Sequence, residues 1–300
     1  MNVWKAGDQE ILEMTEWNMM EIKRCGAETT LKFQQEQGVP FLSFPILEES
    51  GLVSHAFSTR LGGVSKAPYD TMNLSFTRGD RTEDVRENYR RMAAAIGVSM
   101  ERMVLTRQTH TVTVKKVTEA DEGKGVVRER DYTDVDGLIT NVPGITLVAF
   151  GADCVPLYFL DPVHKAIGLS HSGWRGTVNR MGKVTLGAMR REYGTNPEDV
   201  IACIGPSICR DCYEVGEEVA AEFIRAFGSG HKEELMDEKD GGKYQLDLWA
   251  ANRLVLTEAG VRKEQIQTTD ICTYCNPELL FSHRRTGEKR GNLGAFLCLK

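Results

Sequence analysis

Short apolar segments typical of β-strands recur through most of the chain, and they constrain its fold more than any other feature. They are rich in β-branched and aromatic residues, and we expect strands at residues 55–59, 103–107, 111–117, 145–150, 155–160, 165–170, 200–204, 266–271, 278–283 and 293–299. Amphipathic segments that end at glycine indicate helices at 82–96, capped by Thr82, and at 177–193, 213–227 and 247–259. Because helices separate the strands only intermittently, the pattern predicts an α+β fold in which helices pack on mixed sheets.

The chain divides into a leading segment and one long domain. Residues 1–42 are polar and rich in Met and Glu, with some helical character around Trp17, Met20 and Ile22. We interpret them as an N-terminal extension. Residues 43–300 contain no linker rich in Ser, Pro or Gly, which favours a single continuous domain.

Charge and composition exclude several classes of partner. The 37 basic and 43 acidic side chains leave a net charge of −6, so no overall positive field would attract nucleic acid or anionic lipid. No apolar window has the length of a membrane span, and the first residues lack the apolar core of a secretory signal. We therefore expect a cytoplasmic protein whose 8 cysteines are thiols, metal ligands or buried side chains rather than disulfides.

Residues with metal-binding side chains lie at the ends of the predicted strands. His110 and Cys154 each lie between two strands, and His171 follows the strand at 165–170. Because strand ends of one sheet lie close in space, the three side chains can converge. Two imidazoles and one thiolate suit zinc, and three protein ligands leave a fourth position for water or substrate, as in catalytic sites. The spacing alone fits equally a buried cysteine and two hydrogen-bonded histidines.

The sequence around these residues is more specific than their spacing. The motifs, in order, are SHAFSTRLGGVS (54–65), MNLSF (72–76), QTH (108–110), DVDGLIT (134–140), ADCVPLYF (152–159), HSGWRGT (171–177), IGPSICRDCYEVGEEV (204–219) and FSHRRTGEKRG (281–291). Together they resemble the YfiH/YlmD family, also called laccase-domain or DUF152 proteins, over residues 43–300. The resemblance implies an α-β-β-α sandwich similar to cysteine hydrolases. It also implies that His110, Cys154 and His171 bind zinc, a metal that copper can replace on such ligands.

The resemblance further implies an activity. Family members are credited with phosphorolysis of adenosine, inosine and methylthioadenosine to free base and ribose 1-phosphate, and with adenosine deamination. Bacterial members are also named peptidoglycan editing factors. We therefore expect residues 43–300 to be a catalytic domain, His110, Cys154 and His171 to be its catalytic residues, and purine nucleosides and phosphate to be its partners. Neither nucleic acid nor a membrane is expected, and the chain is compatible with a monomer or a homodimer.

Phosphate requires a local cationic site on this acidic chain. Arg60 of TRLGG and Arg175 of GWRG are candidates, because guanidinium groups match phosphate oxygens. Gly62 and Gly63 would let the backbone approach an anion, and the helix that begins near Gly176 would favour negative charge at its N-terminus. The same residues also fit a tight turn and a surface ion pair.

Further substrate-site residues follow from the matched motifs. We assign Asn73 of MNLSF, Gln108 of QTH and Asp153 of ADC to substrate or phosphate binding. Deamination needs an acid/base near the metal, for which Asp153 and Asp136 are both candidates.

Two Cys-x-x-Cys pairs look like zinc knuckles. However, 59 residues separate Cys212 of the first pair from Cys272 of the second, which exceeds the usual spacing of about 15–20 residues. The spacing therefore predicts no structural zinc at Cys209, Cys212, Cys272 and Cys275.

Three other functions remain open. Cys154 with His110 or His171 as base fits an amide hydrolase that edits a peptidoglycan precursor. A copper polyphenol oxidase is less favoured, because a trinuclear copper cluster needs many imidazoles and the chain has only 6 histidines. A non-enzymatic protein would use the N-terminal extension to bind a partner.

Overall fold

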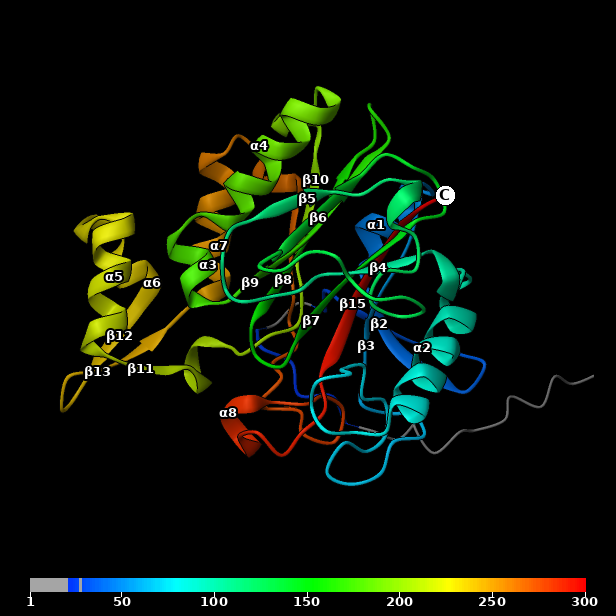
Figure 1. The fold of residues 1–300 in the computed structure, drawn as a ribbon. Helices are drawn as coiled ribbons and strands as arrows, with labels where there is room; N and C mark the ends of the chain where they lie inside the picture. Colours follow the sequence, from blue (N-terminus) through cyan, green and yellow to red (C-terminus); the bar gives the residue numbers. More distant parts are fainter. Residues whose placement is uncertain (1–20, 27–28) are drawn as a thin grey trace, which may run out of the picture.

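Two six-stranded mixed sheets form the centre of the protein (Figure 1). The structure is a computed structural model that describes residues 21–26 and 29–300. The first sheet has the order β1-β2-β3-β15-β7-β4, with strands β1 (Lys32–Glu36), β2 (Val39–Ser43), β3 (Val53–Ser58), β15 (Leu293–Leu299), β7 (Thr146–Gly151) and β4 (Met103–Leu105). The second has the order β14-β10-β8-β9-β6-β5, with strands β14 (Ile266–Thr268), β10 (Ile201–Ile204), β8 (Val155–Asp161), β9 (Ala166–Ser172), β6 (Gly137–Thr140) and β5 (Val114–Lys116).

The two sheets bury a common apolar core. Phe57 and Leu297 of the first sheet pack in one cluster with Leu138 and Leu169 of the second. Tyr158 of β8 is fully buried, and its hydroxyl donates to the carbonyl of Ala56 in β3 over 3.0 Å. Strands β8 and β9 are buried along their whole length, which explains their continuous apolar sequences.

Helices cover the outer face of each sheet, so the layers follow the order α-β-β-α (Figure 1). Helix α2 (Thr82–Ile96) packs Tyr89 and Met92 against the first sheet, and α4 (Met181–Tyr193) and α7 (Leu248–Glu258) pack against the second. The short helices are α1 (Pro45–Glu49), α3 (Trp174–Val178) and α8 (His283–Thr286), and the 3-10 turns are η2 (Met100–Arg102), η3 (Glu119–Asp121), η4 (Pro197–Asp199), η5 (Arg210–Cys212), η6 (Ser229–His231) and η7 (Lys263–Gln265).

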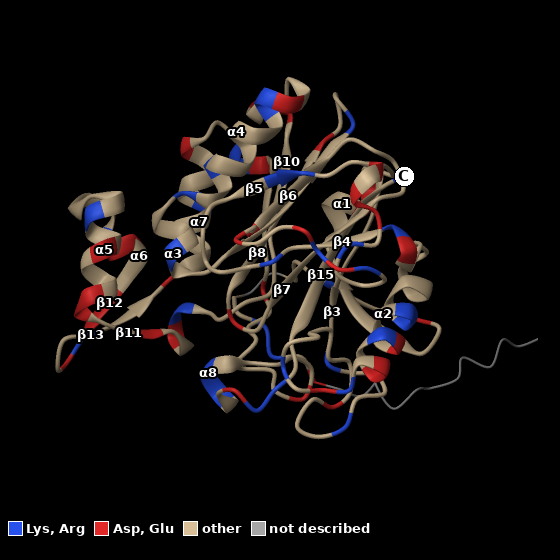
Figure 2. Ribbon diagram, in the orientation of Figure 1, with Lys and Arg blue, Asp and Glu red and all other residues tan. Residues whose placement is uncertain are grey.

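A small third sheet projects from the second sheet's end of the molecule. Its order is β11-β13-β12, with β11 (Glu214–Gly216), β13 (Lys243–Leu246) and β12 (Met236–Lys239), and it packs with α5 (Glu217–Phe227) and α6 (Lys232–Leu235). Acidic residues gather on α5 and α6 (Figure 2). Among the described residues, no helix combines the length and the apolar character needed to cross a bilayer.

The α+β fold with mixed sheets is confirmed. The strand predicted at 278–283 is wrong: this segment turns at Asn276, whose carbonyl accepts from the amides of Leu279 and Leu280. Its apolar side chains, including Phe281, enter the core from turns rather than from a ladder. Thr82 is the first helical residue and not the cap of α2.

Other boundaries differ because of local backbone geometry. The helix predicted at 177–193 is two helices, α3 and α4, since Arg180 adopts a φ of 61° between them. The helix predicted from residue 213 begins at Glu217, after β11. Strand β1 and all but the last residue of β2 lie within the predicted extension, and the first sheet includes this segment because β2 pairs with β3. Trp17 and Met20 lie outside the described residues.

Candidate metal centre and cavity

The ends of strands from both sheets bring His110, Cys154 and His171 together. Their three ligand atoms all lie within 4.8 Å of one another, and the Cys154 Sγ is 4.0 Å from the His110 Nε2. His171 lies on β9, and Cys154 immediately precedes β8, the antiparallel partner of β9. His110 comes from the loop between β4 and β5. The structure therefore places the three predicted ligands in one group.

Asp136 orients both histidines of this group. Its Oδ1 accepts a hydrogen bond from the His171 Nδ1 over 2.8 Å and another from the His110 amide over 3.1 Å. Its Oδ2 accepts from the amides of Thr109 and Thr111 at 3.0 and 3.1 Å. Because the Nδ1 of His171 points to the carboxylate, its Nε2 is left for a metal or a proton, as in carboxylate–histidine–metal arrangements.

These contacts change the interpretation of Asp136. The carboxyl is fully buried, which by itself would raise its pKa, but the hydrogen bonds from His171 and the Thr109 amide outweigh burial and lower the pKa. Asp136 is therefore a fixed anion that positions the histidines. The sequence offered it only as an acid/base, because the backbone turn around His110, where φ is 66°, cannot be read from the motif.

Asp153 positions Cys154 from the preceding residue. Its Oδ1 accepts from the Thr273 hydroxyl over 2.7 Å, and its Oδ2 accepts from the Arg284 amide over 2.6 Å. Its carbonyl accepts from the Ile208 amide over 3.0 Å. Both carboxylate oxygens of Asp153 are thus used by the protein, and its φ of 97° directs the backbone into the turn that carries Cys154.

The ionisation of Cys154 and His171 is coupled in the metal-free group. Burial opposes the Cys154 thiolate, but the charge of His171 and hydrogen bonds from both histidines outweigh it and lower the thiol pKa to about 6. Burial likewise disfavours charge on His171, but Cys154 and Asp136 raise its pKa to about 9. A metal cation that binds here would displace the proton of the imidazolium and take its place beside the thiolate.

The space beside the group fits a metal ion. A Cβ on Gly173 would lie 3.0 Å from the Cys154 Sγ and 3.1 Å from the His110 Cδ2, so glycine at this position leaves room for the ligands. Two imidazoles and one thiolate are donors that zinc accepts at a site with an open position. The donor set and the space are therefore compatible with a catalytic metal.

A cavity of about 550 Å³ opens onto His110, Cys154 and His171. Gln108 lines it as well. The rest of its border includes arginines and two aromatic rings, which are Arg78, Arg107, Arg130, Arg290, Phe76 and Phe150. Among the described residues, no Asp or Glu lines this cavity. Although the chain has a net charge of −6, the side chains around this cavity are cationic. Acidic residues gather instead on α5 and α6 (Figure 2).

Arg290 is the most enclosed of these arginines. Its side chain is only 6% exposed, and its Nη1 donates to the Gly291 carbonyl and to the Asn292 side chain. Its Nε is buried and has no hydrogen-bond partner in the described part of the chain. Burial, reinforced by Arg78, lowers its pKa to about 10, so the guanidinium stays charged. A buried cation with an unused donor at a cavity is suited to an anion.

Sequence reasoning missed this arginine cluster. Arg290 belongs to the basic run of FSHRRTGEKRG, which resembles a solvated rim, and Arg78 follows MNLSF without a distinctive motif. The available signal was the position of Arg290 beside an apolar strand, since β15 begins at Leu293.

Arg60 and Arg175, predicted to bind phosphate, do not line the cavity. The Arg60 guanidinium donates to the carbonyls of Asp70 and Pro277 over 3.0 and 2.8 Å and lies over the Phe281 ring. Arg175 is exposed and lies over the Trp174 ring, 4.3 Å from its centroid. Helix α3, on which Arg175 lies, has only 5 residues, so the predicted anion site at the N-terminus of a long helix is not formed.

Gly62 and Gly63, predicted to let the backbone approach an anion, lie instead against other backbone segments. A Cβ on Gly63 would lie 2.1 Å from the carbonyl oxygen of Thr71, and one on Gly62 would lie 2.8 Å from that of Gly38. These glycines allow close packing of backbone on backbone.

Asn73 and Gln108 support the cavity wall in different ways. Asn73 is fully buried, and its Oδ1 accepts from the amides of Ser75 and Asn292, two lining residues. Gln108 lines the cavity itself, with its Oε1 accepting from the Phe150 amide over 2.7 Å. The structure therefore places Gln108 at the cavity and Asn73 behind it.

The four cysteines of the Cys-x-x-Cys pairs form a second group. Their Sγ atoms all lie within 4.8 Å of one another, although the spacing predicted no joint site. The spacing rule assumes ligands that are close in sequence, whereas here the two pairs follow adjacent parallel strands, which bring them together.

Comparisons with known proteins agree with this architecture. A family described as "Multi-copper polyphenol oxidoreductase laccase" matches residues 54–300. The purine nucleoside phosphorylase YlmD of Bacillus subtilis is 37% identical over 81% of this chain and 87% of its own length. A protein named adenosine deaminase RL5, from an unknown prokaryotic organism, is 36% identical over 79% of this chain and 90% of its own.

A solved structure shows the same fold. The crystal structure of the hypothetical protein YfiH from Bacillus licheniformis superposes with a TM-score of 0.83 at 32% identity, covering 89% of this chain and 99% of that one. From the extent of the family match and the identity to these relatives, the chain belongs to the laccase-like YfiH/YlmD (DUF152) family.

Proposed function

We propose that this protein is a zinc-dependent purine nucleoside phosphorylase that also deaminates adenosine. The observation that carries the proposal is the single cavity in which the metal-binding group, several arginines and two aromatic rings meet. Relatives named purine nucleoside phosphorylase and adenosine deaminase support the same class of substrate.

The arginines provide a place for phosphate. Arg290 offers a buried, unpartnered Nε, and Arg78, whose charge lowers the pKa of Arg290, lines the same cavity. Arg78 is held by an ion pair with Glu288, so it is oriented before an anion arrives. Guanidinium groups neutralise the charge of phosphate and hold its oxygens in a fixed orientation for attack on C1′ of the ribose.

The aromatic rings provide a place for the purine. Phe76 and Phe150 both line the cavity, and Phe76 is itself stacked on Tyr89 with ring centroids 5.6 Å apart. Apolar ring faces of this kind bind a flat heterocycle, while the polar lining contacts the sugar. Asp136 and Gln108 keep the wall of the cavity in one arrangement through their bonds to backbone amides.

His110, Cys154 and His171 would hold the zinc ion. When bound, zinc supplies Lewis-acid chemistry, which polarises an oxygen ligand and lowers the pKa of water. His171 is kept in the correct tautomer by Asp136, and Asp153 fixes the turn that carries Cys154. These residues bind and orient the ion in the wall of a cationic cavity.

The direct test incubates the purified protein with inosine, adenosine and methylthioadenosine, with and without phosphate. We expect free base and ribose 1-phosphate only when phosphate is present, and ammonia from adenosine in either condition. Absence of product from all three nucleosides would overturn the proposal.

A second candidate is an amide hydrolase. Cys154, His171 and Asp136 could act as nucleophile, base and orienting acid. The lowered pKa of the Cys154 thiol suits a nucleophile, and the 2.8 Å hydrogen bond from His171 to Asp136 suits an oriented base. Chelation separates the two functions. A zinc enzyme loses activity with a chelator and regains it with Zn²⁺, whereas a thiol hydrolase is inactivated by alkylation and is unaffected by a chelator.

Copper polyphenol oxidation has less support. The histidines outside the metal-binding group do not gather: His55 is buried against the Phe44 amide, and His164, His231 and His283 each contact a nearby acid in different parts of the fold. The histidines of this chain do not provide the imidazole ligands that a trinuclear copper cluster needs. Any oxidation would therefore involve copper bound to His110, Cys154 and His171.

A further inference from the structure

The two Cys-x-x-Cys pairs lie at the ends of neighbouring parallel strands. Strand β10 pairs in parallel with β14, with Ile204 opposite Thr268. The pairing continues past both strands, since Ser207 forms a parallel bridge with Cys272 and its carbonyl accepts from the Thr273 amide over 3.1 Å. Each strand is followed within a few residues by its cysteine pair, so the fold brings the two pairs together despite their separation in sequence.

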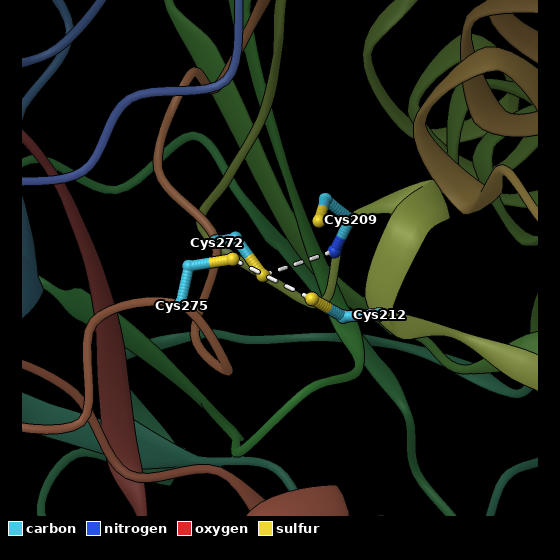
Figure 3. A group of neighbouring side chains, drawn as sticks. All are labelled: Cys209, Cys212, Cys272 and Cys275. Atoms are coloured by element: carbon cyan, nitrogen blue, oxygen red, sulfur yellow. Dashed lines mark hydrogen bonds between the residues drawn. The ribbon is translucent and has the colours of Figure 1, made fainter.

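The sulfur atoms have the spacing of a tetrahedral metal site. Four ligands placed about 2.3 Å from one ion are about 3.8 Å apart, whereas sulfurs in a disulfide are about 2.05 Å apart. Here the four Sγ atoms all lie within 4.8 Å, and those of Cys212 and Cys275 are 3.4 Å apart. Figure 3 shows the side chains converging from the two segments. All four cysteines are free thiols.

The surroundings favour a thiolate-bound ion. Cys272 is fully buried, Cys209 is 5% exposed, and the Cys209 amide donates to the Cys272 Sγ over 3.3 Å. Amide donors to sulfur stabilise ligand thiolates. The Arg285 guanidinium donates to the Tyr274 carbonyl, inside the second pair, and brings a positive charge to this loop.

The donor set selects the metal class. Four thiolates with no carboxylate or imidazole among them suit zinc or an iron–sulfur centre and exclude Mg²⁺ and Ca²⁺. Four protein ligands leave no position open for water or substrate, so an ion here is structural. This differs from the group around Cys154, which has three ligands at a cavity.

The group also lies next to the residues that position Cys154. Ile208, beside Cys209, donates its amide to the Asp153 carbonyl, and Thr273, beside Cys272, donates its hydroxyl to the Asp153 carboxylate. An ion that joins the two pairs would therefore hold both contacts to Asp153. We propose that Cys209, Cys212, Cys272 and Cys275 bind one structural zinc ion, which fixes the two loops that support the turn of Cys154.

The test measures metal content by mass spectrometry in protein purified without chelator. The wild-type chain is expected to contain about two zinc ions, and both Cys154→Ala and the double variant Cys212→Ser/Cys275→Ser about one each. Cys298→Ser is the control, because Cys298 is a free cysteine on β15, away from both groups, and it should keep the wild-type content. Cobalt substitution gives a second readout: the intense charge-transfer bands of a four-thiolate site should persist in Cys154→Ala, and only the weaker band of the single Cys154 thiolate should remain in Cys212→Ser/Cys275→Ser.

A stability measurement covers the case in which the double variant does not fold. Cys154→Ala retains only the four-cysteine site, and a chelator should lower its Tm by roughly 5–10 °C with recovery on adding Zn²⁺. The proposal is overturned by zinc that vanishes completely in Cys154→Ala, by iron in place of zinc at the four cysteines, or by an intact mass that shows a Cys212–Cys275 disulfide in the freshly purified protein.

Discussion

The group of His110, Cys154 and His171 and the group of four cysteines both form at strand ends, but they differ in their ligands and surroundings. Each forms at the ends of adjacent strands: β8 and β9 carry or border Cys154 and His171, and the four cysteines follow β10 and β14. The first mixes imidazoles with one thiolate and faces a cationic cavity. The second contains only cysteines, whose four sulfurs would leave a bound ion no open position. The number and type of ligands, more than their position at strand ends, therefore separate a site for chemistry from a site for stability.

The largest expected effect is on activity at the open group. Cys154→Ala should lower kcat/KM for phosphorolysis on the order of 10³-fold, because it removes a metal ligand at the reacting centre. The melting temperature should fall as well, because the variant loses an ion that only the folded state binds. Coupled assays and thermal melts check both, with Cys298→Ala as the control. If the activity of Cys154→Ala is close to that of the wild type, Cys154 is not a catalytic residue.

The second effect concerns thiol reactivity in metal-free protein. At pH 7 Cys154, with a pKa near 6, should react with iodoacetamide at least about 100-fold faster than Cys212, whose pKa is raised by burial and by the neighbouring thiols. Its rate should fall as the pH drops through 6. Peptide mass spectrometry over a time course measures this, and equal labelling of the two cysteines would contradict it.

The same ionisation makes a prediction about stability. The Cys154 pKa is lowered, so its contribution is lost as the pH falls through about 6. The His171 pKa is raised, so its contribution is lost as the pH rises through about 9. In metal-free protein the stabilisation from this pair should therefore be greatest between these values.

The third effect tests the positioning role of Asp136. Asp136→Asn keeps the size of the side chain but removes the anion that holds His171, so affinity for zinc should fall about 10–100-fold. Titration of metal-free protein with a competing chelator measures it. Asp134→Asn is the control, because Asp134 is exposed and bonds the Thr109 hydroxyl instead of a histidine. Equal losses in both variants would argue against a specific role.

The fourth effect separates phosphate binding from metal binding. Arg290→Met should raise the KM for phosphate about 10-fold or more while leaving zinc content unchanged, because it removes a buried cation from the cavity. Steady-state kinetics with varied phosphate measure this effect. If the KM for phosphate is unchanged, the anion binds elsewhere.

The smallest effect is expected at the arginine that the sequence favoured. Arg175→Ala should change the KM for phosphate less than about 3-fold, because Arg175 is exposed and lies outside the cavity lining. The same kinetic assay applies. An increase as large as that of Arg290→Met would restore the original hypothesis and place phosphate near α3.

The sequence by itself determined the fold class, the family resemblance and the identity of the three residues at the open group. Strand patterns and motifs are local in the sequence, so they can be recognised without a structure. Apolar runs indicated most strands, and QTH, ADC and HSGWRG indicated the three residues that the fold brings together. Local patterns misled where apolar residues such as Phe281 are buried in turns, and where a short break at Arg180 divides one expected helix.

Only the tertiary structure decided which distant residues meet. The parallel pairing of β10 with β14 joins cysteines that lie far apart in sequence, and this pairing is absent from any local pattern. The burial of Arg290 and the contacts of Asp136 depend likewise on packing between segments far apart in the chain. The reason is physical: a ligand set or an anion site is defined by distances between side chains, and those distances are set by the register and order of strands.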